Sequence, residues 1–542
     1  MLKSFVLVIL TVFISLSAHT QNIPRPKLVV GIVVDQMRWD YLYRYYDRYA
    51  ATGGFKRMLN QGFSCENTFI PYAPTVTACG HASIYTGSVP SINGIAGNYW
   101  YDHLLNKSVY CTEDATVATV GSDTKAGLQS PANMLTNTIC DELRLATNFK
   151  SKVIGIAIKD RGSILSAGHS ASAAYWYDPV AGEWVTSTYY MTQLPAWVKT
   201  FNTKKRVDDY YKGGWSLLHP INTYTQSTAD ENKYEGKPLG LDAKGFPYSL
   251  SKFIGTNYGA ISSTPFGNSL TAEMAKAAVI NEQLGADAVT DILAVSFSSP
   301  DYIGHSFGPN SIEVEDNYLR LDKELGDFMD FLDTRVGKGQ YTMFLSADHG
   351  VAHVTTFAKD NKMPAGKVNL DAMVDTMNAQ LKSRYGQDKL VLDITNYRVD
   401  LNLPLIKSAS LNMKEIKNYI VDYLGRQQGI AKVFDVEDLQ TVPLNAKVRT
   451  MLNNGYHPTR SGQIQVILQP QWLEGLGTTG TSHGLWNPYD SHIPLLWYGW
   501  GIKQGKTNRE TYMTDIASTL AALLHIQMPN GAVGDVIAEA IK

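Results

Sequence analysis

Two short segments, 301–305 and 348–349, each join an aspartate to a histidine. Each follows an apolar run, 292–297 and 341–345, that is typical of a buried parallel strand. Strands of an open α/β sheet present their functional side chains at their carboxyl ends. Carboxylate oxygen and imidazole nitrogen are ligands of a borderline divalent metal such as zinc. One Asp–His pair is often only a surface ion pair, but two at strand ends predict a metal site at one edge of one sheet. The candidate ligands are Asp301, His305, Asp348 and His349.

Two further residues are candidate ligands because of where they stand. Asp35 ends the apolar run 27–34, which puts its carboxylate at the same edge, although it could instead cap the following helix. His483 lies in a Gly/Thr-rich loop before the last predicted strand, 493–498, although a lone loop histidine is usually not a ligand. Three histidines near these motifs are interpreted as structural or as supports behind the ligands: His81, His353 and His492.

The segment 74–87 offers a nucleophile, because a polar turn enters a helix of small residues there. A hydroxyl at a helix N-terminus faces free backbone N–H groups and the positive end of the dipole, which favour an alkoxide or a phosphorylated side chain. Thr77 is the candidate and Thr75 the alternative, and either could be a plain N-cap. A threonine hydroxyl is a weak nucleophile at neutral pH, so it needs a cation to lower its pKa.

Three polar residues are candidates for holding an anion. Asn98 offers an amide on a turn, and Lys159 and Arg161 follow the predicted strand 153–158. Residues two apart in extended backbone face the same side, so the two cations can converge on one anion. Arginine brings a planar fork and lysine a point charge, and two cations beside two metals suit a dianion. Taken alone, Lys-x-Arg would more often be a solvated strand end and the asparagine an ordinary turn residue.

Apolar strand-like runs alternate with helical patterns along the chain, which predicts an α/β fold with a doubly wound, mostly parallel sheet flanked by helices. Pro494 places the last strand at a sheet edge or marks a strand start. An amphipathic stretch spans 39–59. The helical patterns are 270–281, 312–332, 370–381 and 515–524.

The 542 residues are enough for a large core in one big domain or in two to three smaller ones, and we expect a leader followed by one domain over residues 24–542. Two segments break the alternation of strands and helices, at about 170–265 and 398–470. We interpret both as cap insertions that shape a substrate pocket, with a purely surface-completing role as the alternative.

The first residues predict export. Residues 1–20 combine a basic start, a short apolar run and small residues, as in a signal peptide that is cleaved after Ala18 or Thr20. The apolar run is too short to span a bilayer comfortably, and no later segment has the length and apolar character to do so. We therefore expect an exported protein, periplasmic or secreted, without an integral membrane segment.

The net charge limits which partners are expected, and the cysteine content limits which disulfides can form. A net charge of −2 with 18% charged residues gives no polybasic footprint, so nucleic acid or anionic lipid is not expected as the main partner. In an oxidising compartment the four cysteines could form up to two disulfides, with three possible pairings. Cys79 lies in a predicted helix and is expected to be a buried thiol; the others are Cys65, Cys111 and Cys140.

Several long strings, together covering nearly the whole mature chain, resemble the alkaline phosphatase superfamily of two-metal phosphoryl and sulfuryl transferases. The resemblance is strongest to exported, phosphate-insensitive alkaline phosphatases of the PafA type, and it implies an alkaline-phosphatase-like fold. The matching strings are 24–40, 87–97, 308–316, 346–350 and 513–516.

The resemblance implies a secreted zinc enzyme that hydrolyses phosphate monoesters through a phospho-threonine and releases inorganic phosphate. Thr77 matches the nucleophile, and Lys159 matches a lysine that replaces a third metal of some relatives. The expected partners are small-molecule phosphate monoesters, with the chain acting as a monomer. One of two Zn²⁺ would be held by Asp35, Thr77, Asp348 and His349, and the other by Asp301, His305 and His483. The residues that match the phosphate contacts are Asn98, Lys159 and Arg161.

Three alternatives stay open. A phosphodiesterase or nucleotide pyrophosphatase of the same superfamily would share the metals, but Lys159 and Arg161 favour a monoester because they would contact oxygens that only a monoester leaves free. A sulfatase would need a Cys/Ser-x-Pro/Ala-x-Arg string, and 79–83 lacks both the Pro/Ala and the Arg. A non-catalytic metal-dependent binder of phosphorylated ligands would lack a ligand or the nucleophile, and none is missing.

Overall fold

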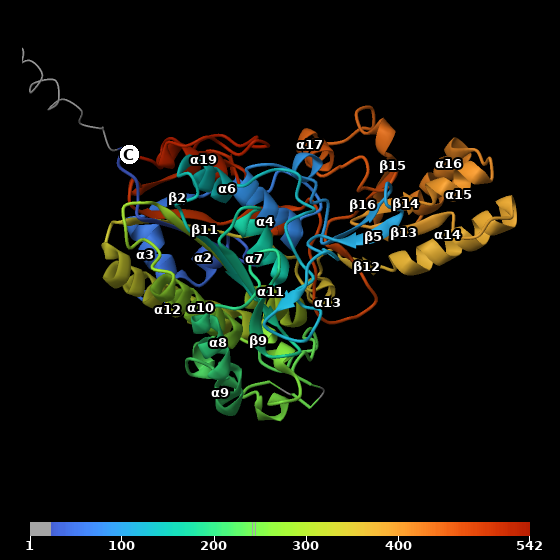
Figure 1. Ribbon diagram of the computed structural model, residues 1–542. Coiled ribbons are helices and arrows are strands. Elements are labelled where there is room, and N and C mark those ends of the chain that lie inside the picture. Colours follow the sequence, from blue (N-terminus) through green and yellow to red (C-terminus); the bar gives the residue numbers. More distant parts are fainter. Residues whose placement is uncertain (1–22, 241, 244) are drawn as a thin grey trace, which may run out of the picture.

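A computed structural model describes residues 23–240, 242–243 and 245–542 (Figure 1). The signal peptide predicted at 1–20 therefore lies outside the described residues. Within them, the largest sheet has ten strands. In spatial order these are β20 (Gly505–Thr507), β2 (Phe63–Cys65), β19 (Leu495–Gly499), β11 (Tyr341–Ser346), β1 (Leu28–Val34), β10 (Asp291–Phe297), β7 (Val153–Ala157), β8 (Ala173–Asp178), β9 (Glu183–Ser187) and β6 (Thr119–Val120).

The centre of this sheet is parallel and its flanks are mixed. β1 pairs in parallel with β10 and β11, β10 pairs with β7, and β7 with β8. Every residue of β1, β10 and β11 is buried, because helices cover both faces, and this explains their continuous apolar runs. The predicted α/β class is confirmed, with antiparallel pairs at β19 and β9. Pro494 precedes β19, which lies inside the sheet, so it marks a strand start and not an edge.

Two groups of helices enclose the sheet (Figure 1). One face carries α4 (Thr77–Thr86), α6 (Ile139–Ala146), α7 (Asp160–Ala167) and α19 (Asp515–Leu524). The other carries α3 (Gly54–Gln61), α10 (Phe266–Asn281) and α12 (Ile312–Leu332). The amphipathic stretch 39–59 is interrupted between α2 (Tyr41–Arg44) and α3, where the Asp322 carboxylate accepts from the N–H groups of Ala50, at 2.9 Å, and Phe55, at 3.0 Å.

The segment predicted as an insertion at 170–265 differs at its start, because β8 and β9 belong to the large sheet. Both strands are rich in aromatic and polar residues, which hid their buried character in the sequence. Only the later part, with α8 (Ala196–Thr203), α9 (Arg206–Gly213) and long loops, lies outside the sheet, at the bottom of Figure 1.

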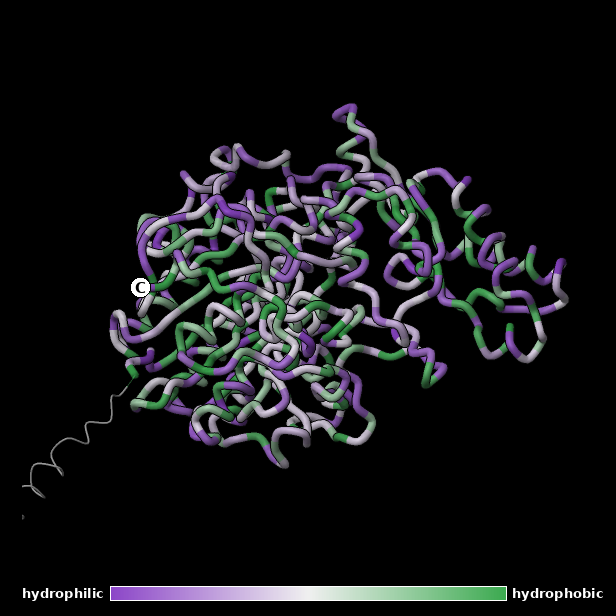
Figure 2. The backbone as a smooth tube through the Cα atoms, turned by 90° about the horizontal axis from the view of Figure 1, so that it is seen from above, coloured by the Kyte–Doolittle hydropathy of each residue, from purple (hydrophilic) through white to green (hydrophobic). Residues whose placement is uncertain are grey.

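The segment predicted as an insertion at 398–470 overlaps a separate small unit that begins earlier in the chain. Its four-stranded antiparallel sheet has its own apolar core, and it projects from the main body in Figures 1 and 2. Its strands, in spatial order, are β13 (Val391–Thr395), β14 (Arg398–Leu401), β16 (Ile464–Leu468) and β15 (Ile430–Asp435). Its helices include α14 (Leu370–Tyr385), α16 (Met413–Gly425) and α17 (Ala446–Asn454).

Arg398 joins this small unit to the segment that leads into α4. The side chain is 2% exposed and donates to Gln465 Oε1 at 3.0 Å, Gly455 O at 3.0 Å, Leu452 O at 3.3 Å and Ala73 O at 3.4 Å. Burial lowers the pKa of Arg398 to about 10. A buried arginine held by neutral acceptors therefore connects the two units close to the candidate nucleophile.

All four cysteines are described, and all are buried free thiols, so none of the possible disulfides forms. Cys79 lies in α4, as expected of a buried helical thiol. Among the described residues, none of the helices combines the length and apolarity needed to cross a bilayer.

Replacing Arg398 by Ala should lower the free energy of unfolding by about 3 kcal/mol, because it leaves buried acceptors without a donor and opens a cavity. Urea unfolding measures this change. Arg426 is a matched control, because it is exposed and its guanidinium pairs with Asp422 at 2.7 Å on the surface. Its replacement by Ala should change the stability by less than about 0.5 kcal/mol. Equal losses in the two variants would contradict this role of Arg398.

Candidate active site

The register of the central strands brings the predicted ligands to one edge. Val34 pairs with Phe297, Val33 with Ser346, and Ser296 with Ala157, so the strands end nearly level. The residues that follow these ends are Asp35, Lys159, Asp301 and Asp348. Asp301 and His305 stand one turn apart on α11 (Ser299–Phe307), which begins directly after β10.

Two clusters of potential ligand atoms form at this edge. The first cluster consists of Asp35, Asp348 and His349, and the second consists of Asp301, His349 and His483. Within each cluster the potential ligand atoms lie within 4.8 Å of one another. His349 belongs to both, and its ring stacks on His483 with centroids 3.5 Å apart. Asp35 and Asp348 thus lie in one cluster, and Asp301 and His483 lie in the other.

His305 lies at the rim of the second cluster. Its Nε2 is 3.1 Å from Asp301 Oδ1, and its side chain is 34% exposed. It is therefore close to the cluster without belonging to either tight group.

The carboxylates show that a cation fits these clusters. Asp35 Oδ1 and Asp348 Oδ2 are buried and accept no hydrogen bond. Burial raises the pKa of Asp35 to about 6 although the Lys159 ammonium opposes the shift. Burial and repulsion by Asp35 raise the pKa of Asp348 well above its usual range. Lys159 Nζ, at 2.7 Å from Asp35 Oδ2 and 2.6 Å from Asp301 Oδ2, leaves part of this negative charge uncompensated.

The imidazoles are oriented for metal binding. In each of the three rings, Nδ1 lies within hydrogen-bond distance of a backbone carbonyl oxygen. His349 Nδ1 is 3.0 Å from Gly350 O, His483 Nδ1 is 2.7 Å from Thr75 O, and His305 Nδ1 is 2.8 Å from Thr481 O. Each Nε2 is thereby left to face the clusters. Burial lowers the pKa of His349 well below its usual range and that of His483 to about 3, so both rings are neutral, as ligands must be.

Thr77 begins α4 beside His349, the residue that the two clusters share. Its Oγ1 lies 3.4 Å from Lys159 Nζ and 3.4 Å from His349 Nε2. A Cβ on Gly80, one turn further, would lie 2.5 Å from Asp348 Cβ, so only glycine lets the helix come this close. The Thr75 hydroxyl donates to Leu485 O at 2.8 Å and faces the backbone instead. The geometry therefore favours Thr77 over Thr75 as the nucleophile.

Asn98 and Arg161 offer donors beside Thr77. Asn98 Oδ1 accepts from the N–H of Ala78 at 2.9 Å, which leaves its amide nitrogen for a ligand. Arg161 Nη1 donates to Tyr110 O–H at 3.1 Å, while its buried Nε has no hydrogen-bond partner. Both side chains thus carry N–H donors that the protein itself leaves without an acceptor.

The predicted reason for the convergence of Lys159 and Arg161 is wrong. Lys159 precedes α7 and Arg161 lies in its first turn, so the two do not share an extended strand. Lys159 faces the carboxylates, and Arg161 is held from the side by Tyr110, whose hydroxyl donates to Asp160 Oδ1 at 2.6 Å.

The other histidines near the motifs serve neighbouring groups. His81 Nδ1 lies 2.9 Å from Thr77 O and its Nε2 2.8 Å from Ser296 Oγ, so it supports the start of α4. His353 contacts Asn310 and Arg38, and His492 contacts Glu66 O at 3.2 Å.

Sequence reasoning missed Tyr110 and Gln36. Tyr110 lies about fifty positions from the arginine that it orients, and nothing in the local sequence marks it. Gln36 Nε2 donates to Asp301 Oδ1 at 2.7 Å, and its backbone N–H donates to Asp348 Oδ1 at 3.1 Å. Its only signal was its position directly after Asp35.

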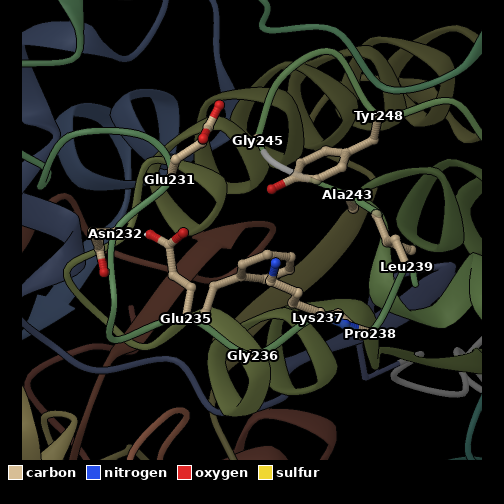
Figure 3. Close-up of a pocket in the computed structure, with 11 residues that line it drawn as sticks. Glu231, Asn232, Glu235, Gly236, Lys237, Pro238, Leu239, Ala243, Gly245 and Tyr248 are labelled. Atoms are coloured by element: carbon tan, nitrogen blue, oxygen red, sulfur yellow. Dashed lines mark hydrogen bonds between the residues drawn. The ribbon is translucent and has the colours of Figure 1, made fainter. Parts of the chain in front are cut away.

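A separate acidic cavity of about 260 Å³ is lined in part by Phe307, the last residue of α11 (Figure 3). The Glu235 carboxylate and the Tyr248 hydroxyl point into it. Burial and the nearby Glu313 raise the pKa of Glu235 to about 9. The cavity lining contains none of the candidate ligands. The loop around it contacts α11 where Gly236 N–H donates to Ser306 O at 2.7 Å.

An α/β sheet whose carboxyl edge holds two carboxylate–imidazole clusters beside a helix-terminal threonine defines a metal-dependent enzyme of the alkaline phosphatase superfamily. The chain belongs to the type I phosphodiesterase / nucleotide pyrophosphatase family, whose sequence model matches residues 29–486. The predicted resemblance is thereby confirmed.

Relatives of similar length lie within this superfamily. The chain is 51% identical over 526 residues to the alkaline phosphatase PhoV of Synechococcus elongatus, covering 97% of this chain and 95% of that protein. It is 52% identical over 545 residues to a Myroides odoratus protein named calcium-transporting ATPase, covering 100% and 99%. The crystal structure of the alkaline phosphatase PafA matches with a TM-score of 0.94 at 49% identity, covering 96% of this chain and 100% of that one.

The buried Asp35 gives the metal-free protein a specific pH dependence. Its pKa rises from 3.8 to about 6 on folding, so the folded state binds more protons in this window and stability falls as the pH rises through it. About two pKa units correspond to roughly 3 kcal/mol.

In Asp35→Asn this fall should be smaller by about 3 kcal/mol, and the part that remains belongs to Asp348, whose burial also raises its pKa. Thermal unfolding of chelator-treated protein between pH 4 and pH 8 measures the difference. Added zinc should stabilise the wild type at pH 8 more than the variant. Parallel pH profiles for the two metal-free proteins would contradict the assignment of this charge.

Proposed function

We propose that the chain is an exported, zinc-dependent alkaline phosphatase that hydrolyses small phosphate monoesters through a phosphorylated Thr77. The observation that carries this proposal is the Thr77 hydroxyl, which lies at the N-terminus of α4 within 3.4 Å of both Lys159 Nζ and His349 Nε2. The names of PhoV and PafA support the same activity. We further propose that residues 1–20 direct export and that the enzyme acts as a monomer.

The donor set favours zinc over calcium or magnesium, which prefer oxygen ligands throughout. Bound zinc would supply a Lewis acid that lowers the pKa of a coordinated hydroxyl and neutralises charge on phosphoryl and leaving-group oxygens. One ion would be held by Asp35, Thr77, Asp348 and His349. The other would be held by Asp301, His305 and His483.

Thr77 Oγ attacks phosphorus in line and the bond from phosphorus to the ester oxygen breaks. The proton that the Thr77 hydroxyl loses passes to solvent, and the leaving oxygen takes a proton from solvent and departs as an alcohol. The positive end of the α4 dipole and the Lys159 ammonium stabilise the negative oxygen. Water then attacks the phospho-threonine, releases inorganic phosphate and restores the hydroxyl. Through both steps Asn98 and Arg161 donate to phosphoryl oxygens whose charge shifts.

The anion-binding donors favour monoesters over diesters, although the family description includes phosphodiesterases. The amide nitrogen of Asn98 and the guanidinium of Arg161 suit unsubstituted oxygens, and a diester carries a second substituent on one of them. The terminal phosphoryl group of ATP also has unsubstituted oxygens, so the site would accept it by the same chemistry. ATP should therefore be tested as a substrate, and the name of the Myroides relative, a calcium-transporting ATPase, is a second reason to test it.

Replacing Thr77 by Ala should lower kcat for an aryl phosphate monoester by at least about a thousandfold, because the attacking oxygen is lost. Zinc content, measured by plasma emission, should remain close to two ions per chain. Thr75→Ala is the matched control and should keep most of its activity, since its hydroxyl faces Leu485 O. Full activity in Thr77→Ala would exclude Thr77 as the nucleophile. If the wild type released no phosphate from any monoester, the chain would instead be a non-catalytic binder of phosphorylated ligands.

Replacing Arg161 by Ala should lower kcat/KM for an aryl monoester by about a hundredfold, because one anchored donor to the phosphoryl group is lost. The matching diester should lose less than about tenfold. Removing Lys159 and Arg161 together should widen this difference between the esters. Arg426→Ala is the control for loss of an arginine, and equal losses on both esters would contradict monoester selection.

A further inference from the structure

Gln36 contacts both metal clusters through different parts of one residue. Its backbone N–H donates to Asp348 Oδ1 at 3.1 Å, and its side-chain Nε2 donates to Asp301 Oδ1 at 2.7 Å. Asp348 belongs to one cluster and Asp301 to the other. Gln36 is 2% exposed, so water does not compete for either hydrogen bond.

The backbone and a neighbouring glycine fix this residue in place. Gln36 has a φ of 65°, a left-handed conformation that a non-glycine residue keeps only where its surroundings determine it. A Cβ on Gly304 of α11 would overlap Gln36 Oε1, so the glycine leaves room for the amide between β1 and α11. The amide oxygen therefore lies against Gly304, and its nitrogen points at Asp301.

We propose that Gln36 is a positioning residue that sets the orientation of the Asp301 carboxylate relative to the cluster of Asp35 and Asp348. This role of Gln36 rests on the proposed function in one respect, namely that the two clusters bind zinc. Hydrogen bonds to ligating carboxylates tune metal affinity by about 10- to 100-fold. Because only the side chain reaches Asp301, its loss should weaken one zinc site and spare the other.

The test compares metal binding in Gln36→Gly and Gln36→Glu. Glycine keeps the backbone N–H and accepts the positive φ, so that variant should fold, whereas glutamate replaces the donor by a charge that repels Asp301. Gln283→Gly is the matched control, since Gln283 is exposed and has a φ of 54°. Metal-free proteins are titrated with zinc against a chromophoric chelator, and anomalous diffraction at limiting zinc identifies the site.

Gln36→Gly should weaken the site at Asp301 by about 10- to 100-fold and the site at Asp35 by less than about threefold. Gln36→Glu should weaken the Asp301 site at least as much, and the control should match the wild type. Unchanged affinities, or equal losses at both sites, would overturn the proposal. A wild type that binds no zinc would refute the proposed function instead, which keeps the two failures distinct.

Discussion

Buried negative charge is the constraint on which the rest of the structure depends. Asp35, Asp301 and Asp348 meet at one sheet edge with Lys159 as the cation in direct contact with two of them. Isolated buried carboxylates are strongly unfavourable, and the raised pKa values of Asp35 and Asp348 express that strain. A fold with this many buried carboxylates is stable only if cations neutralise them. Metal ions bound at the two clusters would supply the missing positive charge and so explain why the carboxylates are buried.

The central sheet makes this concentration of charge possible. Parallel strands that are buried on both faces hold their carboxyl ends level, and each is followed within a few residues by a charged side chain of the site. Helix α4 closes the site from one face, with glycine at its contact with Asp348. Positions remote in the chain thus share one pocket because backbone pairing, and not local sequence, sets their separation.

The central strands and the aspartates that follow them could be predicted from the sequence, because the continuous hydrophobicity of a buried strand is visible there. The runs at 292–297 and 341–345 were continuous because both sheet faces are covered, so the strands and the aspartates after them could be read directly. β8 was missed because its aromatic and polar residues conceal a buried parallel strand. Arg161 was placed in the right site for the wrong reason, since a helix begins directly after Lys159. Gln36 and Tyr110 depend on long-range contacts that leave no local pattern.

The position of the small unit along the chain affects the two clusters unequally. It follows Asp348 and His349 and precedes His483. The cluster of Asp35, Asp348 and His349 is therefore built from residues that all precede the unit, whereas the cluster of Asp301 also takes a donor from beyond it. A displacement of the small unit would thus disturb the Asp301 cluster before the Asp35 cluster.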